Sequence, residues 1–451
     1  ALNQNIFLWD TCFLTMFCNY AHRFVPGIGS VDNFYVKQHE TGEICREINR
    51  NSGVDFDPWI NRERRDLYSA WGNTKAGYPI TYRDREIPQP PPLLTLDALN
   101  HPILAWAEQE SLRITGDHSR IGLVYEPLVR YYRALQKYIR QGNGLYITDW
   151  ASMDNSPRNR FIEGGGTAVD TSSEMVMFGN QLAEFAAFLG KKKEAIAFRK
   201  EADEDARLIR EKMWDPEEKF FYDLTLDENR VPVKTIAGYW VLLSGVATPE
   251  QADALAAELS NPKTFGRPHR VPTLAADQAG YHEYGDYWKG AVWAPTEMMV
   301  VRGLERYGKH DLAREIAMEH LSHIGTVFEK TGTVWENYSA EMSAQGNHSS
   351  PDFVGWTGLG PILFLFEFAI GIKADAVENS IVWNVTSPQR VGIENFWFGD
   401  KTVDLVCEAV GENGIRTLKV FSTEPFTLVV HWKEKQAKFE VSAGKEISQQ
   451  I

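Results

Sequence analysis

The sequence predicts a mainly α-helical protein that ends in a small all-β region, and three observations support this fold class. From Phe7 to about Gly371, apolar residues recur at helical spacing in one segment after another. After Ala374 the segments become short and rich in β-branched and aromatic residues. Long and short connections alternate between the helical segments, which suits a closed ring of helical hairpins with its long loops on one face.

The helical segments are expected to form hairpins. Gly116-Asp117 ends one helix and begins the next, and Gly190 separates another pair, because glycine stops helices and aspartate caps them. A long loop over residues 142–166 is expected after the first pair. The expected helices cover residues 94–115, 120–141, 172–189, 191–213, 234–244, 249–259, 287–307, 310–328 and 353–370.

The last part of the chain is expected to form a β-sandwich-like domain. Turn sequences such as Gly411-Glu412-Asn413-Gly414 separate its short strands. We therefore expect two domains, a helical one over residues 1–374 and a β domain over residues 375–451. The expected strands cover residues 380–385, 390–398, 403–410, 415–421, 426–432 and 436–441.

Composition and charge exclude several classes of protein. The 451 residues are 43% hydrophobic and 24% charged, which is ordinary for a globular protein. A net charge of −14 argues against nucleic acid or an anionic membrane surface as a partner. No apolar run reaches the roughly 20 residues that cross a bilayer, so no membrane span is expected. The chain starts at Ala1 with a helix-like segment almost at once, and we expect an upstream portion to be missing from it.

The cysteines and the aromatic residues are informative in different ways. Four cysteines without metal-site spacing suggest no disulfide framework and leave the cellular compartment open.

Aromatic residues reach 12% of the chain, with 14 Trp among them. Flat indole rings pack well on the C–H faces of sugars, so the excess of Trp favours sugar binding. The alternative is a large core that happens to be rich in Trp.

One candidate catalytic residue is Asp154, in the segment Trp150-Ala151-Ser152-Met153-Asp154-Asn155-Ser156-Pro157-Arg158. Trp150 and Met153 would partly desolvate this carboxyl and raise its pKa, as a general acid at neutral pH requires. Arg158 would make a good clamp for sugar hydroxyls. The alternative is that Asp154 only forms a turn, for which Asp-Asn-Ser-Pro is a favourable sequence.

A second candidate is Glu336, in Val334-Trp335-Glu336-Asn337-Tyr338, where aromatic neighbours make full exposure of the carboxylate improbable. Its alternative is a solvated surface glutamate. Glu341, five residues on, is the rival carboxylate, and we favour Glu336. Two carboxylates in such settings are what glycosidic bond cleavage requires, one to protonate the leaving oxygen and one to activate water or attack.

Two further segments pair acids with indoles. Trp9-Asp10 stands at the start of the first helix, where Asp10 would grip sugar hydroxyls or only stabilise the helix end. The segment 286–295 contains Trp288 and Trp293, which would either face a pocket or belong to the core.

Other chemistries find little support. His39, His269, His282 and His348 are scattered without ligand spacing, so a zinc site is not expected. The sequence has no Gly-rich phosphate loop after a strand, no Gly-x-Ser-x-Gly elbow and no twelve-residue calcium loop. We therefore expect neither a cofactor nor a metal.

In this order, these segments resemble those of six-hairpin glycosidases, the glycoside hydrolases with an (α/α)6 barrel of the trehalase and family 63 α-glucosidase group. Singly the matches are weak, but their order is fairly specific for the group. The matching segments are Trp9-Asp10-Thr11-Cys12-Phe13, Gln89-Pro90-Pro91, Ser152-Met153-Asp154-Asn155-Ser156-Pro157-Arg158, Tyr287-Trp288-Lys289-Gly290-Ala291-Val292-Trp293-Ala294-Pro295, Trp335-Glu336-Asn337-Tyr338 and Gly355-Trp356-Thr357.

The resemblance implies an inverting hydrolase of α-glycosides, with Asp154 as general acid and Glu336 as general base. The substrate it implies is an α-glucoside or α-mannoside, either an oligosaccharide or a glycosylglycerate. The trehalase segments are degraded here, which argues against trehalose, and the short architecture is closer to the hydrolases of mannosylglycerate and glucosylglycerate. The residues it implies at the substrate are Trp9, Asp10, Gln89, Arg158, Trp288, Gly290, Trp293 and Trp356.

Two other functions stay open. Sugar 2-epimerases also use helical barrels, but they rely on histidines, and none stands in the segments above. Two histidines facing each other in the mouth of the barrel would favour that function. A non-catalytic carbohydrate-binding protein is the second alternative, and the loss of either carboxylate would favour it.

Overall fold

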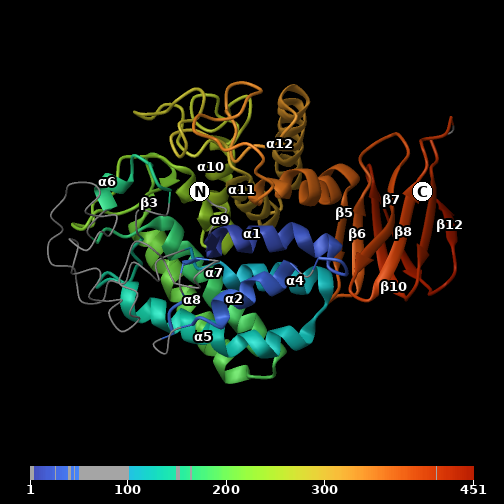
Figure 1. Cartoon of the computed structure of the whole chain (residues 1–451), viewed down its shortest axis with the longest axis horizontal. Coiled ribbons are helices and arrows are strands. Elements are labelled where there is room, and N and C mark those ends of the chain that lie inside the picture. Colours follow the sequence, from blue (N-terminus) through green and yellow to red (C-terminus); the bar gives the residue numbers. More distant parts are fainter. Residues whose placement is uncertain are drawn as a thin grey trace.

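The computed structural model of the chain describes residues 5–25, 27–38, 42–44, 46–49, 101–148, 153–162, 165–412 and 414–451. Its helices gather in one body, and the strands β5 to β12 form sheets at one side of that body (Figure 1). The helical part has the (α/α)6 barrel fold of glycosidases, and the all-β region follows it in the chain. The sequence predicted this fold class correctly. The domain boundary at residue 374 stays a prediction.

The barrel is built around a ring of helices, each of which contacts the next, with the last returning to the first. Helix α7 is buried on nearly all sides, whereas the neighbouring α8 buries a single stripe from Phe198 to Ile209. This difference places α7 in the inner ring and α8 outside it. The ring consists of α1 (Leu8–Cys18), α4 (Leu104–Thr115), α7 (Val169–Phe188), α9 (Trp240–Ser244), α11 (Ala294–Arg306) and η8 (Trp356–Leu359).

Further helices follow the inner ones along the chain. Three of them, α5, α8 and α12, pack against the inner helix that precedes each, and the wide π-type helix η9 packs against α12. None of the described helices has both the length and the apolar character that a bilayer crossing needs. The bounds of these helices are α5 (His118–Ile139), α8 (Lys192–Lys212), α10 (Pro249–Glu258), α12 (His310–Thr331) and η9 (Gly360–Ile370).

Local sequence explains where several of these helices start and stop. Gly116 adopts a left-handed φ of 65° at the end of α4, and the Asp117 side chain accepts hydrogen bonds from the first amides of α5. Gly190 separates α7 from α8 with a φ of 75°. Thr248 and Gln251 form a capping box at the start of α10. The stops predicted at Gly116-Asp117 and Gly190 are thus confirmed.

Several predicted helices start too early, since residues 101–103 and 353–355 lie outside helices, and one of these helices concerns the site. The sequence predicted a helix over residues 287–307, but α11 begins at Ala294. Tyr287 and Gly290 have positive φ angles of 60° and 119°, which the right-handed helix does not allow. Residues 287–293 are therefore a loop, and this loop reaches the cavity described below.

The carboxyl-terminal region contains two four-stranded sheets, in the orders β11-β10-β6-β5 and β12-β9-β8-β7. Neighbouring strands are antiparallel except for β10 and β6, which are parallel. The sequence missed β5 and β12. The strands are β5 (Ile372–Asp375), β6 (Ser380–Asn384), β7 (Val391–Phe398), β8 (Lys401–Cys407), β9 (Thr417–Ser422), β10 (Phe426–Trp432), β11 (Lys435–Val441) and β12 (Ile447–Gln450).

The sheets are joined to the barrel by backbone and side-chain hydrogen bonds. The amides of Ala376 and Gly399 donate to the carbonyls of Arg113 and Ile114 at the end of α4, over 2.7 and 2.8 Å. The Trp383 indole donates to the carbonyl of Ile370 at 2.9 Å. The all-β region thus braces the end of the barrel at which α4 stops.

The remaining elements are short. They are β1 (Asn5–Phe7), which pairs with β2 (Glu47–Asn49), β3 (Trp214–Asp215), which pairs with β4 (Phe220–Phe221), η2 (Asn19–Ala21), η3 (Gly27–Val31), α2 (Asp32–Tyr35), α6 (Asn159–Ile162) and η7 (Ile236–Tyr239).

Candidate active site

A cavity of about 1090 Å³ opens where three distant parts of the chain meet. They are the start of α1, the loop 286–287 and the segment 348–355, and one residue of the predicted acid segment, Asn155, joins them. Two predicted site residues, Asp10 and Glu336, line this cavity. Its volume is large enough for a disaccharide-sized ligand.

Glu336 is held in the cavity wall by neutral donors. Its Oε1 accepts a hydrogen bond from the Tyr287 hydroxyl at 3.1 Å, and its Oε2 accepts one from the backbone amide of Ser350 at 3.2 Å. The side chain is almost wholly buried, and this burial raises the pKa of Glu336, although the two hydrogen bonds act in the opposite direction. Glu336 is therefore an oriented carboxylate with a raised proton affinity.

Asn155 connects the segment of Asp154 to the segment of Tyr287. Its side chain donates to the carbonyl of Asp286 at 3.0 Å and accepts from the amide of Trp288 at 2.8 Å. Tyr287 lies between these two bonds and contacts Glu336. One chain of hydrogen bonds therefore fixes the segments of the two predicted catalytic acids relative to each other.

Asp154 lies in a tight turn directly after Met153. Met153 has a φ of 90°, which is rare for a residue with a side chain. The Asn159 amide group donates to the carbonyls of Met153 and Asp154, at 2.9 and 3.2 Å. These bonds hold the turn in its unusual conformation, and the Asp154 side chain remains only partly buried.

Asp10 brings a third acid to the same place. Burial raises the pKa of Asp10 to about 8, and the negative charges of Glu336 and Asp154 raise it further. Asp10 and Glu336 line the same cavity, and the segment of Asp154 is tied to it through Asn155. At neutral pH Asp10 is mostly protonated, so it can both donate and accept a hydrogen bond.

Three of the four predicted tryptophans form an aromatic layer behind Glu336. Trp288 stacks on Trp293 with 4.6 Å between ring centroids, and Trp293 contacts Trp356 at 5.5 Å. The Trp356 indole donates to the backbone carbonyl of Glu336 at 2.8 Å. All three are buried, so they support the carboxylate from behind and are not among the described residues that line the cavity.

Comparison with known proteins adds to this geometry. The sequence pattern of the mannosylglycerate hydrolase MGH1-like glycoside hydrolase domain matches residues 95–357. The chain belongs to this family. An uncharacterized protein of Borreliella burgdorferi is 25% identical to this glycoside hydrolase over 443 residues, which cover 95% of this chain and 85% of that protein.

Solved structures share the fold of this glycoside hydrolase at low sequence identity. The GH63 mannosylglycerate hydrolase of Thermus thermophilus, in complex with glucose, has a TM-score of 0.59 at 19% identity and covers 80% of this chain and 92% of its own. The neutral trehalase of Saccharomyces cerevisiae has a TM-score of 0.53 at 15% identity, with coverages of 80% and 71%. The α-L-rhamnosidase of Dictyoglumus thermophilum has a TM-score of 0.58 at 12% identity, with coverages of 98% and 45%.

The expected sugar contact from Arg158 does not agree with its position. Its side chain is 0% exposed and pairs with the carboxylates of Asp170 and Asp223, the second at 3.1 Å. These counter-charges fix the guanidinium inside the protein, where it joins the acid segment to α7. Arg158 is therefore a structural residue in this glycoside hydrolase.

Two other expected substrate residues also serve the scaffold. Trp9 is only partly buried, and its ring packs on Phe13, His101 and Trp240. A side chain at Gly290 would meet the Tyr281 ring at 2.8 Å, so glycine is needed there for close packing. Gln89 lies outside the described residues.

The rival carboxylate, Glu341, is engaged elsewhere. It accepts hydrogen bonds from the Arg267 guanidinium at 2.7 and 2.8 Å and from the Tyr281 hydroxyl at 2.5 Å. The Arg267 pairing lowers the pKa of Glu341. This geometry favours Glu336 as the reactive glutamate.

Sequence reasoning missed several cavity residues. Asn155 and Tyr287 were passed over although each stands beside a residue that was chosen. Asp286 and His348, which lie 3.4 Å apart, also line the cavity. Two histidines do face each other in this structure, His269 and His320, but both are buried and neither is among the described lining residues. They therefore do not support the epimerase alternative.

Proposed function

We propose that this protein hydrolyses an α-glycosidic bond with inversion, with Asp154 as general acid and Glu336 as general base. The observation that carries the proposal is the cavity wall that Glu336 and Asp10 share, in which two hydrogen bonds orient Glu336 and Asn155 ties the segment of Asp154 to that of Tyr287. Glycosidic cleavage by inversion needs one acid and one base on opposite faces of the sugar.

In the proposed reaction, Asp154 gives its proton to the glycosidic oxygen as the bond to the anomeric carbon breaks. Glu336 takes a proton from a water molecule, and the water oxygen bonds to the anomeric carbon from the opposite face. The products are a free sugar of inverted anomeric configuration and an alcohol. The base is well suited to this step, because the raised pKa of Glu336 strengthens it.

Asp10 is proposed to bind the sugar. Because its pKa is raised to about 8, its carboxyl group is mostly neutral at pH 7 and can donate to one hydroxyl while accepting from another. A second ionised carboxylate beside Glu336 would be unfavourable, so the neutral form also limits charge repulsion.

The substrate class we propose is an α-glucoside or α-mannoside, with a sugar or glycerate as the leaving group. The test is a panel that contains mannosylglycerate, glucosylglycerate and α-linked disaccharides, followed by measurement of the released sugar. We expect one member to be cleaved by the wild-type chain. Asp154→Asn, prepared in the same way, should be slower by at least about a hundredfold, because a general acid contributes that much or more. If Asp154→Asn kept most of the rate, the assignment of the acid would be wrong.

A further inference from the structure

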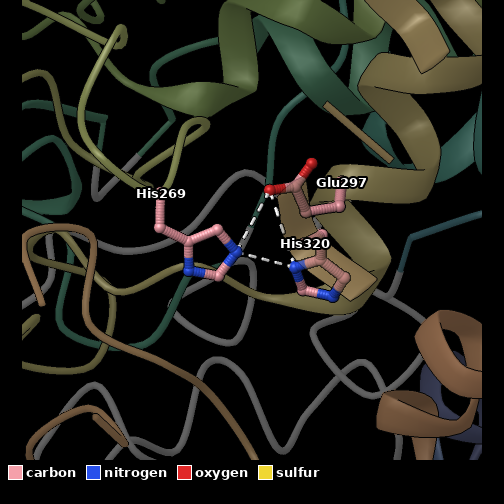
Figure 2. Close-up of side chains that lie close together, drawn as sticks. All are labelled: His269, Glu297 and His320. Carbon is pink, nitrogen blue, oxygen red and sulfur yellow. Dashed lines mark hydrogen bonds and ion pairs between the residues drawn. The ribbon is translucent and has the colours of Figure 1, made fainter. Parts of the chain in front are cut away.

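A second cluster of ionisable residues lies in the interior, away from the described lining of the cavity. His269 precedes the loop of residues 286–293, Glu297 stands in the first turn of α11, and His320 stands in the middle of α12. Figure 2 shows the two imidazoles and the carboxylate pointing toward one common centre. All three side chains are at most 1% exposed.

Hydrogen bonds inside the protein do not account for this arrangement. His269 Nε2 and His320 Nδ1 lie 2.9 Å apart, but Glu297 Oε1 is 3.7 Å from each of them, beyond hydrogen-bond distance. Both carboxylate oxygens of Glu297 are buried without a hydrogen-bond partner. A buried carboxyl group without partners is costly.

The chemistry of the three side chains suits a metal ion. Each of them offers one ligand atom to the common centre. Two neutral imidazoles and a carboxylate are the donor set that divalent transition metals prefer.

We propose that His269 Nε2, His320 Nδ1 and the Glu297 carboxylate bind one divalent transition-metal ion, for which Zn²⁺ is the natural probe. The three separations are 2.9, 3.7 and 3.7 Å, and the point equidistant from the three atoms lies about 2.0 Å from each. This matches the bond lengths of about 2.0–2.2 Å that zinc makes to histidine nitrogen and carboxylate oxygen.

The surroundings of His269 support this role. Its second ring nitrogen, Nδ1, lies 3.2 Å from the backbone carbonyl of Ser339. A proton on Nδ1 donated to this carbonyl leaves Nε2 with a free electron pair toward the centre, which is the usual arrangement of a metal-binding histidine. His323 stacks on the His269 ring with 3.9 Å between centroids, while its own Nε2 faces the carbonyl of Ala344 at 3.5 Å. His323 is therefore a packing neighbour and not a ligand.

The ion would have a structural task. The amide of His269 donates to the carbonyl of Ala340 at 2.9 Å, and Tyr338 exchanges two backbone hydrogen bonds with Val292. The ion would thus join α11, α12 and the loop of His269 directly behind the strand-like segment that contains Glu336. His269, Glu297 and His320 are not among the described residues that line the cavity, so the ion takes no part in the proposed hydrolysis.

The test uses the full chain, produced without a metal-affinity tag, stripped with a chelator and titrated with Zn²⁺ in a calorimeter. We expect one ion per chain and a higher Tm in its presence. Glu297→Gln and His320→Gln should each weaken binding by at least about tenfold, since even second-layer partners of a metal site contribute that much. His323→Gln is the matched control, because it changes a histidine in the same cluster that is not a ligand, and it should bind Zn²⁺ as the wild type does.

Two outcomes would overturn the proposal. One is a stripped wild-type chain that neither binds Zn²⁺ with one-to-one stoichiometry nor gains in Tm. The other is binding that Glu297→Gln and His320→Gln retain, which would place the ion elsewhere. If the ligand variants did not fold, the wild-type titration and His323→Gln would still decide the question. None of these measurements requires turnover, so the metal site and the hydrolase function succeed or fail separately.

Discussion

Two groups of buried carboxylates in the barrel differ in what surrounds them. Near the all-β region, Glu367 accepts hydrogen bonds from Arg113 at 2.7 Å, from Arg302 at 2.8 Å and from the Tyr20 hydroxyl at 2.5 Å. The two guanidinium groups lower the pKa of Glu367 to about 2, despite its burial. At the cavity, the donors to the Glu336 carboxylate among the described residues are neutral, and its pKa is raised.

This difference shows that, in one barrel, the carboxylates that stabilise the fold and those proposed for catalysis have different neighbours. A carboxylate between two arginines is permanently charged and can only hold the structure together. A carboxylate with neutral partners and two acids nearby keeps a variable proton, as acid–base catalysis requires. The following predictions test this contrast, from the largest expected effect to the smallest.

The sharpest contrast within one segment is between Glu336 and Glu341, five residues apart. Glu336→Gln should lower kcat by about 10²–10⁴-fold, because the base at the cavity is lost. Glu341→Gln removes a carboxylate that is paired with Arg267 outside the cavity lining, and it should change kcat only by a few fold. Steady-state kinetics of both variants provide the measurement. The reverse order of effects would assign the base to Glu341.

At the supporting end, Glu367→Gln should lower the free energy of unfolding by about 3–5 kcal/mol, since it removes a fully buried carboxylate from the ion-pair network of Arg113 and Arg302, in which Glu110 and Glu305 remain. The pKa of Glu367 is about 2 in the folded chain and ordinarily 4.5, so its contribution is complete above pH 4.5 and is lost as the pH falls toward 2. Urea unfolding at pH 7 and pH 3 should therefore show a smaller difference between variant and wild type at pH 3. An equal difference at both values would contradict the pairing.

A substitution at Arg158 tests whether this residue, close in sequence to Asp154, stabilises the fold or binds the substrate. Arg158→Met should destabilise the fold by about 3–5 kcal/mol, because Asp170 and Asp223 stay buried without their cation. The KM of the folded fraction should stay near the wild-type value. A stable variant with a strongly raised KM would restore Arg158 as a sugar clamp.

Asp10 should make stability depend on pH in the opposite sense to Glu367. Its pKa is raised from 3.8 to about 8, so its contribution is complete below pH 3.8 and is lost as the pH rises to about 8. Asp10→Asn cannot ionise and should lose less stability than the wild type between pH 5 and pH 9, as measured by urea unfolding. Asp277→Asn, at an exposed position, is the control and should follow the wild type.

The smallest effect is expected from removing the Tyr287 hydroxyl, the neutral side-chain donor to Glu336. Tyr287→Phe removes the 3.1 Å hydrogen bond that lowers the pKa of Glu336, so this pKa should rise further. The acidic limb of the pH–rate profile should then move to higher pH, at a cost of about 0.5–1.5 kcal/mol in transition-state stabilisation. An unmoved limb would mean that Tyr287 does not act on the base.

Most of the fold could be predicted because its signals are local. Helix α8 has one apolar stripe and follows the helix stop at Gly190, and helix α10 has a capping residue at Thr248. The sequence was ambiguous over residues 287–293: Gly290 and Pro295 favour a loop that enters a helix, whereas the apolar pattern favoured a helix from residue 287, and the structure has the loop. Strand β12 was missed since its sequence, Ile447–Gln450, is polar and pairs only at the edge of a sheet.

The site residues, too, could be predicted where the signal is local and could not where it depends on distant residues. Asp10 and Glu336 were found because each stands next to a tryptophan. The partners of Asn155 and Arg158 were not found, since they come from residues up to 133 and 65 positions away. Likewise, His269 and His320 are 51 positions apart, and no spacing rule connects them. Charge balance inside a barrel depends on which distant segments meet, and sequence patterns do not contain that information.

The most direct test of the central claim is the configuration of the sugar at the moment of release. A proton NMR time course with the substrate identified from the panel records the anomeric signals before mutarotation equalises them. Inversion by Asp154 and Glu336 predicts that the β-anomer appears first from an α-linked substrate. Initial release of the α-anomer would contradict the account, because Glu336 would then act as a nucleophile and not as the base that activates water.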